Sequence, residues 1–348
     1  MANQNVGTPR FYINDLTYSI ATGQLEIQTT STNPNAEYLS IINGNPSNTT
    51  LINQSYTTAG GGDAPLNLRY TRINRNRPNY IAVLGHNLNS QQMGIRHYYW
   101  TNPDEYEWNG GHGLTDIING ENGEIVHPTD TASDFLQPTY DGFSICEVTA
   151  SDDDYYGLSN LQFAIDTTTE GERQLKIGSI FMGQYYDMPH SPDLSLKMSH
   201  EYKGIKKQES MGGSTLTNVN YYKPPDWGNL EAWQLGFFPR KYSGRRIWNL
   251  TFSYLSDDKV EPKHYDMDET HSDWKDNWFS NVLHYTMGGA LPFIFQPDNS
   301  ATYTTDDGTG EITAIPELAI CRFDMNTFSR TQVAHNMYTI SVKIEESW

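Results

Sequence analysis

Two histidines and four carboxylates lie within ten residues, from His264 to Asp273, and form the one metal-like cluster of the sequence. His264 and His271 are seven residues apart, which matches neither the histidine pair of zinc proteases nor the twelve-residue calcium loop. Acidic side chains just ahead of a helix also have a structural reason, because they stabilise its N-terminus. We therefore interpret the cluster as an acidic loop that opens a helix, with a metal site as the less favoured alternative, and expect no metal and no cofactor.

Catalytic signatures point in the same direction. The Gly-x-Ser-x-Gly motif, the P-loop and the dinucleotide fingerprint are all missing, which argues against a serine hydrolase, an NTPase and a dehydrogenase. The paired carboxylates of glycoside hydrolases come from distant strands and leave no local spacing, so that alternative stays open. We expect a protein that is not an enzyme.

Aromatic side chains could bind sugar rings by stacking. Tyr98 to Trp100 lie in an expected strand and are better explained as core residues. Tyr106, Trp108 and His112 fall in a long polar loop, where binding residues are commonly found. These three are the candidate glycan-binding residues.

Short apolar runs separated by Gly, Pro, Asn, Ser and Thr favour strands over helices. Tyr80 to Leu88 begins with a continuous apolar run and predicts a core strand buried on both faces. Gln174 to Gly183 predicts its partner, with a bulge at Gly178. We also expect strands at Arg10 to Asn14 and Tyr38 to Ile42.

The second half of the chain shows clearer periodicity. Arg246 to Leu255 and Met337 to Ile344 alternate with a period of two and predict half-buried strands. Trp274, Trp278 and Val282 recur every four residues and predict one helix from Trp274 to His284, capped by Ser272 or Asp273.

A break at His190 to Asp193 divides the chain in two. The sequence predicts an all-β, mainly antiparallel protein with two β-sandwich or jelly-roll-like domains, at residues 1–190 and 191–348, and the helix in the second. Cys146 and Cys321 fall in different halves, so we expect both to be free and buried.

The formal charge of −19 argues against binding nucleic acid or an anionic membrane. Between Leu196 and Lys263, however, eleven Lys or Arg face seven Asp or Glu, a local charge of about +4 against about −23 elsewhere. Complementary charge of this kind can guide contacts between subunits. The candidate interface residues are Lys206, Lys207, Arg240, Lys241, Arg245 and Arg246, with Trp227, Trp233 and Phe237 as apolar contacts.

The Gly-His-Asn-Leu end of the Tyr80 strand, the Gly94 to Trp100 segment and the Leu175 to Gly183 strand resemble galactose-binding-like jelly rolls of tailed-bacteriophage virion proteins. The second half, with its Arg246 strand and Leu291-Pro-Phe-Ile-Phe-Gln-Pro-Asp298, is similar to phage tail or baseplate proteins. The resemblance covers about residues 78–187 and 205–348. It implies a structural role and provides no catalytic residues.

From this resemblance we expect a virion component, in the tail or tail tip, that assembles into a symmetric oligomer with copies of itself and other tail proteins. A host surface glycan is a further candidate partner. No signal peptide or apolar span is visible, so we expect synthesis in the host cytoplasm. The alternative is a glycan-binding adhesin or a polysaccharide-degrading enzyme.

Overall fold

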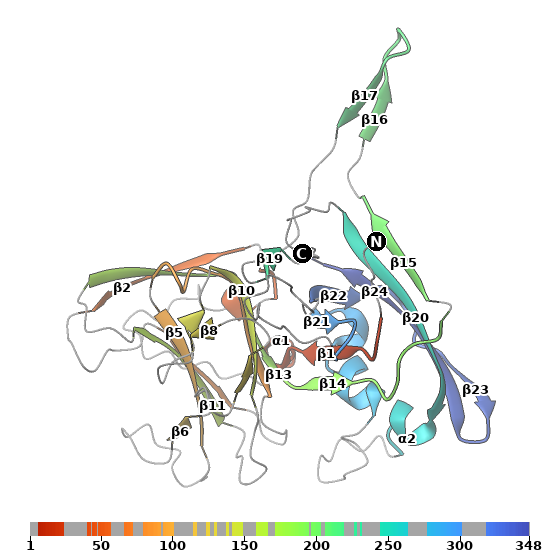
Figure 1. The fold of residues 1–348 in the computed structure, drawn as a ribbon, viewed down its shortest axis with the longest axis horizontal. Helices are drawn as coiled ribbons and strands as arrows, with labels where there is room; N and C mark the ends of the chain where they lie inside the picture. Colours follow the sequence, from red (N-terminus) through yellow and green to blue (C-terminus); the bar gives the residue numbers. More distant parts are fainter. Residues whose placement is uncertain are drawn as a thin grey trace, which may run out of the picture.

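The chain is mostly β, in antiparallel sheets with a few short helices (Figure 1). The expected all-β, mainly antiparallel class is therefore confirmed. The structure is a computed structural model and describes residues 6–23, 40–42, 44–46, 48–56, 66–71, 79–91, 93–100, 114–116, 123–125, 129–130, 137–138, 141–148, 158–165, 171–194, 196–202, 206–218, 226–227, 230–231, 244–263, 277–300 and 318–347.

The strands of the first half are β1 (Arg10–Ile13), β2 (Thr50–Tyr56), β3 (Leu66–Thr71), β4 (Tyr80–His86), β5 (Met93–Trp100), β6 (Leu114–Asp116), β7 (Gly123–Ile125), β8 (Thr129–Asp130), β9 (Gln137–Pro138), β10 (Gly142–Val148), β11 (Leu158–Ile165), β12 (Gly171–Ile177), β13 (Ser179–Gly183) and β14 (Tyr185–Asp187). Those of the second half are β15 (Lys197–Glu201), β16 (Lys206–Glu209), β17 (Thr215–Asn218), β18 (Asp226–Trp227), β19 (Leu230–Glu231), β20 (Arg245–Ser256), β21 (Phe293–Gln296), β22 (Ala319–Phe323), β23 (Arg330–Ala334) and β24 (Met337–Glu346). The helices are α1 (Asp15–Ala21), α2 (Asp257–Val260), the π-helical η3 (Phe279–Leu283) and the 3-10 turn η4 (Met287–Gly289).

The largest sheet has the strand order β14-β1-β21-β22-β24-β20-β15, with β23 added to β24. Its central strands contribute to two cores, one on each face of the sheet, because successive side chains point to opposite sides. Phe11 and Phe295 belong to one core, where their ring centroids lie 5.3 Å apart. Tyr12 and Ile294, the alternate residues of the same strands, belong to the other core.

A second sheet, built around β13-β4-β10, covers one face of the large sheet. Tyr80, Ala82 and Leu84 of β4 pack in the core that holds Tyr12 and Ile294. The alternate residues of β4 are buried as well, on the other face of the strand. The prediction of a core strand buried on both faces is confirmed, and β13 is its antiparallel neighbour.

Strand pairing crosses the expected boundary near residue 190. β1, at residues 10–13, pairs with β21 and with β14. The core that contains Tyr80 also contains Ile320, from the far end of the chain. Among the residues that the structure describes, the N-terminal strand thus completes the sheet of the C-terminal half.

One expected strand is wrong. Within Tyr38 to Ile42 the structure describes residues 40–42, and they form a 3-10 turn instead of a strand. Ile41 and Ile42 are buried, and the carbonyl of Ile42 accepts a hydrogen bond from the Thr17 hydroxyl. The apolar residues therefore indicate that this segment is buried next to α1, and a buried segment can be a turn as well as a strand.

The two period-two segments are confirmed as strands. β20 and β24 pair with each other, and Trp248, Leu250 and Phe252 of β20 point into the core. The pairing register shifts between Phe252 and Leu255, and Tyr254 within that shift has a φ of 61°.

The helix expected at Trp274 to His284 is described from residue 277 onward. Trp278 and Val282 are buried on it, as their spacing predicted. At the described start of this segment, Asn277 Oδ1 accepts a hydrogen bond from the backbone N–H of Ser280 at 2.8 Å. Both predicted caps lie outside the described residues.

Candidate assembly surface

β16 and β17 form a hairpin, and within the described part of the chain they pair only with each other. The turn is closed by hydrogen bonds from Gly213 N to Ser210 O and from Ser210 N to Ser214 O, both 2.9 Å. Gly213 has a φ of +80°, a conformation that favours glycine. Gly212-Gly213 therefore lies in the end turn of a well-formed hairpin, which we call the arm.

The arm is exposed along nearly its whole length. From residue 206 to residue 217, only Ser210 is even partly covered. Met211 at the tip is fully exposed and Leu216 is 61% exposed. Lys206 and Lys207, two of the predicted interface residues, lie on β16 with exposed side chains.

Figure 1 shows the arm projecting beyond β15, clear of both large sheets. An isolated two-stranded hairpin is marginally stable in water, because it buries too little apolar surface to offset its conformational entropy. An arm that displays Met211 and Leu216 gains stability when a second surface covers it. This makes the arm the strongest candidate for a contact with another protein.

A second exposed surface lies at the register shift of β20. Tyr254 is 72% exposed, and Val333 and Met337 of the β23–β24 hairpin are also exposed. They lie at one end of the sheet, because Met337 pairs with both Ser256 and Ala334. Asp257 and Asp258, at the start of α2, follow directly and are exposed. We call Tyr254, Val333, Met337, Asp257 and Asp258 the bulge surface.

The other predicted interface residues have different environments. Arg245 is partly buried on β20, and Arg246 is fully buried. Trp227 lies on β18, where the structure describes only the backbone. Arg240, Lys241, Trp233 and Phe237 lie outside the described residues.

Arg246 is a core residue, and its charge is not available to a subunit interface. Its guanidinium donates to Glu346 Oε1 at 3.2 Å and to the carbonyl of Leu318 at 3.3 Å. Its backbone N–H donates to Glu346 Oε2 at 2.9 Å, and its guanidinium carbon lies 4.8 Å from the centre of the Trp248 ring. Burial lowers the pKa of Arg246, and Glu346 opposes that shift. The pair holds the beginning of β20 against the end of β24.

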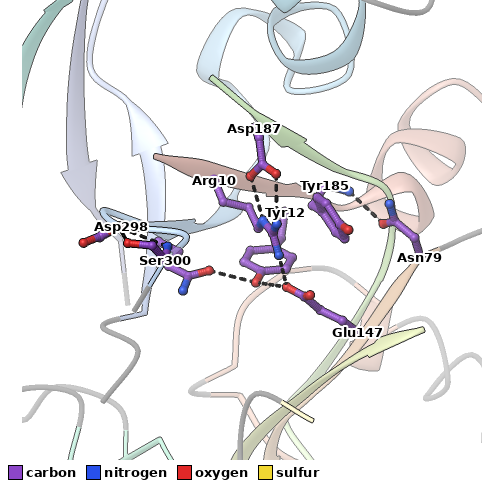
Figure 2. Close-up of polar contacts among 9 residues, drawn as sticks. Arg10, Tyr12, Asn79, Glu147, Tyr185, Asp187, Asp298 and Ser300 are labelled. Atoms are coloured by element: carbon purple, nitrogen blue, oxygen red, sulfur yellow. Dashed lines mark hydrogen bonds and ion pairs between the residues drawn. The ribbon is translucent and has the colours of Figure 1, made fainter. Parts of the chain in front are cut away.

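A second polar cluster joins the two large sheets (Figure 2). Arg10 of β1 donates two hydrogen bonds to the carboxylate of Asp187 on β14, at 2.7 and 2.8 Å. Its third donor group reaches Glu147 Oε1 on β10 at 2.5 Å, and the Tyr12 hydroxyl donates to the same oxygen. The Arg10 guanidinium also lies 3.9 Å from the centre of the Tyr185 ring.

The chemistry of this cluster is that of a structural clamp. Burial is the first cause that raises the pKa of Tyr12 well above its ordinary value, and the charge of Glu147 adds to it. The pKa of Arg10 is also raised, because its hydrogen bonds to Asp187 and the charge of Glu147 outweigh its own burial. Tyr12 therefore stays protonated and Arg10 stays charged at neutral pH. Their hydrogen bonds fix β1 to β14 and to β10.

His86 and Ser144 form the pair that most resembles a catalytic dyad, with His86 Nε2 2.7 Å from Ser144 Oγ. The backbone N–H of Leu88 donates to His86 Nδ1, which places the ring proton on Nε2. Nε2 then donates to Ser144 and does not accept its proton, so this tautomer is not a general base for Ser144. Burial lowers the pKa of His86 to about 4, against the opposing charge of Asp141. The pair is a neutral hydrogen bond in the core.

The remaining residues of the Gly-His-Asn turn also have structural roles. Asn87 accepts from Lys176 N at 2.7 Å and donates to Gln174 O at 2.8 Å, so its side chain pairs with the edge of β12 as a strand would. Gly178, the expected bulge, lies between β12 and β13, and a Cβ there would lie 2.2 Å from Pro46 O. The turn and Gly178 thus allow a close approach of three backbone segments.

The candidate glycan-binding residues Tyr106, Trp108 and His112 lie outside the described residues, and so does the cluster from His264 to Asp273. In the part of the chain that the structure does describe, no three His, Cys, Asp or Glu side chains come together as metal ligands could. Cys321 is a buried free thiol, and burial raises its pKa well above the ordinary value. No described helix is long and apolar enough to cross a membrane.

Comparisons with known proteins provide no family for this chain. No family model matches it, and no curated protein sequence matches it. Among solved structures, the chain is similar to a truncated AlyQ with CBM32 and alginate lyase domains, at 9% identity and a TM-score of 0.27 over 93% of this chain and 97% of that one. A TM-score this low carries no argument about the fold or the function of this chain.

The Arg10 cluster and the buried role of Arg246 were not predicted from the sequence. Arg10, Glu147 and Asp187 are distant in sequence, so no spacing marks them. Arg246, however, shares the inward phase of Trp248 and Leu250, and that alternation was a usable signal of burial.

Proposed function

We propose that this chain is a non-catalytic structural subunit that assembles with copies of itself. The observation that supports the proposal is the arm, a hairpin that stands outside both cores and presents two lysines and two large apolar side chains. The rest of the chain is acidic, so another copy offers a surface of opposite charge. The polar clusters described above act as clamps within the chain, which suits a rigid building block.

The finer form of the proposal is a virion component of a tailed phage, in the tail or tail tip. It rests on the resemblance of the Tyr80, Leu175 and Arg246 strands to phage virion proteins. Immunogold labelling of purified phage particles, with antibodies against this chain, tests it. Label on the tail supports the proposal, and particles that lack the chain contradict it.

Sedimentation velocity over a hundredfold range of protein concentration tests self-assembly. We expect the full chain to sediment as a multimer. A variant in which residues 206–217 are replaced by a short Gly-Ser loop should sediment as a monomer with an unchanged near-UV circular dichroism spectrum, because the arm carries no aromatic residue and belongs to neither core. A full chain that stays monomeric throughout would contradict the proposal.

The glycan-binding alternative depends on Tyr106, Trp108 and His112 and remains a prediction. A glycan array tests it directly. Binding that is lost in Trp108→Ala but kept in the arm-deleted variant would favour an adhesin, and an array without signal would leave only the assembly proposal.

A further inference from the structure

We propose that the arm of one copy docks on the bulge surface of a second copy, head to tail. This inference rests on the proposed function and specifies the two surfaces that meet. The occupant of each surface is therefore another copy of the same chain.

The apolar parts of the two surfaces are matched in kind. The arm presents Met211 and Leu216, and the bulge surface presents Tyr254, Val333 and Met337. Methionine adapts its shape to an aromatic partner and makes favourable sulfur–aromatic contacts. Tyr254 is held outward in a left-handed conformation that non-glycine residues adopt at a cost of about 1 kcal/mol. In the proposed contact, the outward Tyr254 ring covers apolar side chains of the neighbouring copy.

The charged parts are complementary. Lys206 and Lys207 lie at the base of the arm, with Glu209 as its one acid, so the arm is net positive. Asp257 and Asp258 are exposed on the bulge surface, while Lys259 beside them is partly buried. The neighbouring charges of Arg330 and Glu261 form an ion pair with each other. Two lysines on one surface therefore face two aspartates on the other.

The two surfaces lie at opposite ends of the large sheet, so they are suited to meet between copies. The arm follows Glu201, which pairs with Arg245 at the beginning of β20. The bulge surface lies at the other end of β20, near Ser256. A twelve-residue strand spans about 35–40 Å. In Figure 1 the arm points away from α2 and β23, so it does not reach the bulge surface of its own chain.

A contact between two different surfaces is heterologous. Repeated from copy to copy, it closes into a ring if the rotation permits and otherwise extends as a filament. The contact thus supplies a specific route to the multimer that the proposed function requires. Apolar side chains at its centre provide affinity, and the lysine–aspartate pairs at its rim set register.

Photo-cross-linking tests the contact. A benzophenone amino acid replaces Met211 in the full chain, and this variant is mixed with isotopically heavy wild-type chain before illumination. We expect light–heavy cross-links to peptides that contain Tyr254 or Met337. The matched control carries the same probe at Leu194, which is fully exposed but belongs to neither surface, and should not give these peptides.

Charge reversal provides a second, independent test. Lys206→Glu with Lys207→Glu should weaken self-association about tenfold, and so should Asp257→Lys with Asp258→Lys, since tenfold corresponds to about 1.4 kcal/mol. A chain that carries all four changes should regain association, because the opposite charges face each other again.

The outcomes separate the two proposals. Multimers whose cross-links map elsewhere, or a fourfold variant that stays dissociated, would overturn this inference and leave the proposed function intact. A wild-type chain that is monomeric would overturn both.

Discussion

Replacement of Arg246 by methionine distinguishes a core clamp from an interface residue. Arg246 and Glu346 are each about 1% exposed, and the guanidinium and the carboxylate face each other at 3.2 Å. Methionine preserves much of the side-chain volume and the backbone N–H bond to Glu346. It removes the positive charge and leaves a buried carboxylate without its ion-pair partner.

The expected cost is about 3–5 kcal/mol of unfolding free energy, the range found when one partner of a buried pair is removed. Urea denaturation followed by tryptophan fluorescence measures it. Lys343→Met is the matched control on β24, the strand that carries Glu346, because the ion pair of Lys343 with Asp324 is exposed and contributes at most about 1 kcal/mol. The double variant Arg246→Met with Glu346→Leu should be more stable than Arg246→Met alone, because the uncompensated charge is gone.

A different result would refute this reasoning. If the unfolding free energy of Arg246→Met lies within about 1 kcal/mol of the wild-type value while self-association weakens, Arg246 acts at an interface, as the sequence first suggested. Equal losses in Arg246→Met and Lys343→Met would show that burial of the pair does not set its contribution.

Three further predictions concern the clamps and the close backbone contacts. The pKa of His86 is about 4 in the folded state against 6.5 when unfolded, so its contribution to the unfolding free energy is fully present above pH 6.5 and is lost as pH falls to 4. In urea titrations at different pH values, His86→Asn should remove about 3 kcal/mol of this pH dependence. An unchanged pH dependence would contradict the assignment. In the same assay, Gly178→Ala should lower the unfolding free energy by about 3 kcal/mol, since its Cβ would meet two carbonyl oxygens. The control Gly23→Ala has a positive φ but open space around it and should cost about 1 kcal/mol. Equal losses in the two variants would refute the importance of the close contacts at Gly178. Tyr12→Phe removes the hydroxyl that donates to Glu147 and should lower the unfolding free energy by about 1–3 kcal/mol, which is measured as a lower melting temperature. A melting temperature equal to that of the wild type would show that the cluster does not hold the strands together.

Local patterns in the sequence predicted individual strands well. The continuous apolar run of β4 and the alternation of β20 and β24 record which faces are buried, and each of these strands formed where expected. The Gly212-Gly213 pair at the tip of the arm is a signal of the same local kind. Such features depend on neighbours a few residues away, which a sequence displays directly.

Long-range pairing was not predictable in the same way. The pairing of β1 with β21 joins residues that are nearly 300 positions apart, and nothing in Arg10–Ile13 indicates which sheet it enters. The clamp of Arg10, Glu147 and Asp187 depends on that pairing, so it was hidden for the same reason. The Arg246–Glu346 pair was accessible, because both residues continue the inward phase of their strands and lie at the paired ends of β20 and β24.

The central claim is that copies of this chain assemble with one another through the arm. Native mass spectrometry of the full chain tests it most directly, because it counts subunits of 39.6 kDa each. We predict one dominant closed multimer of three or more subunits, which the arm-deleted variant cannot form. A single 39.6 kDa species at every concentration, or the same multimer with and without the arm, would contradict the claim.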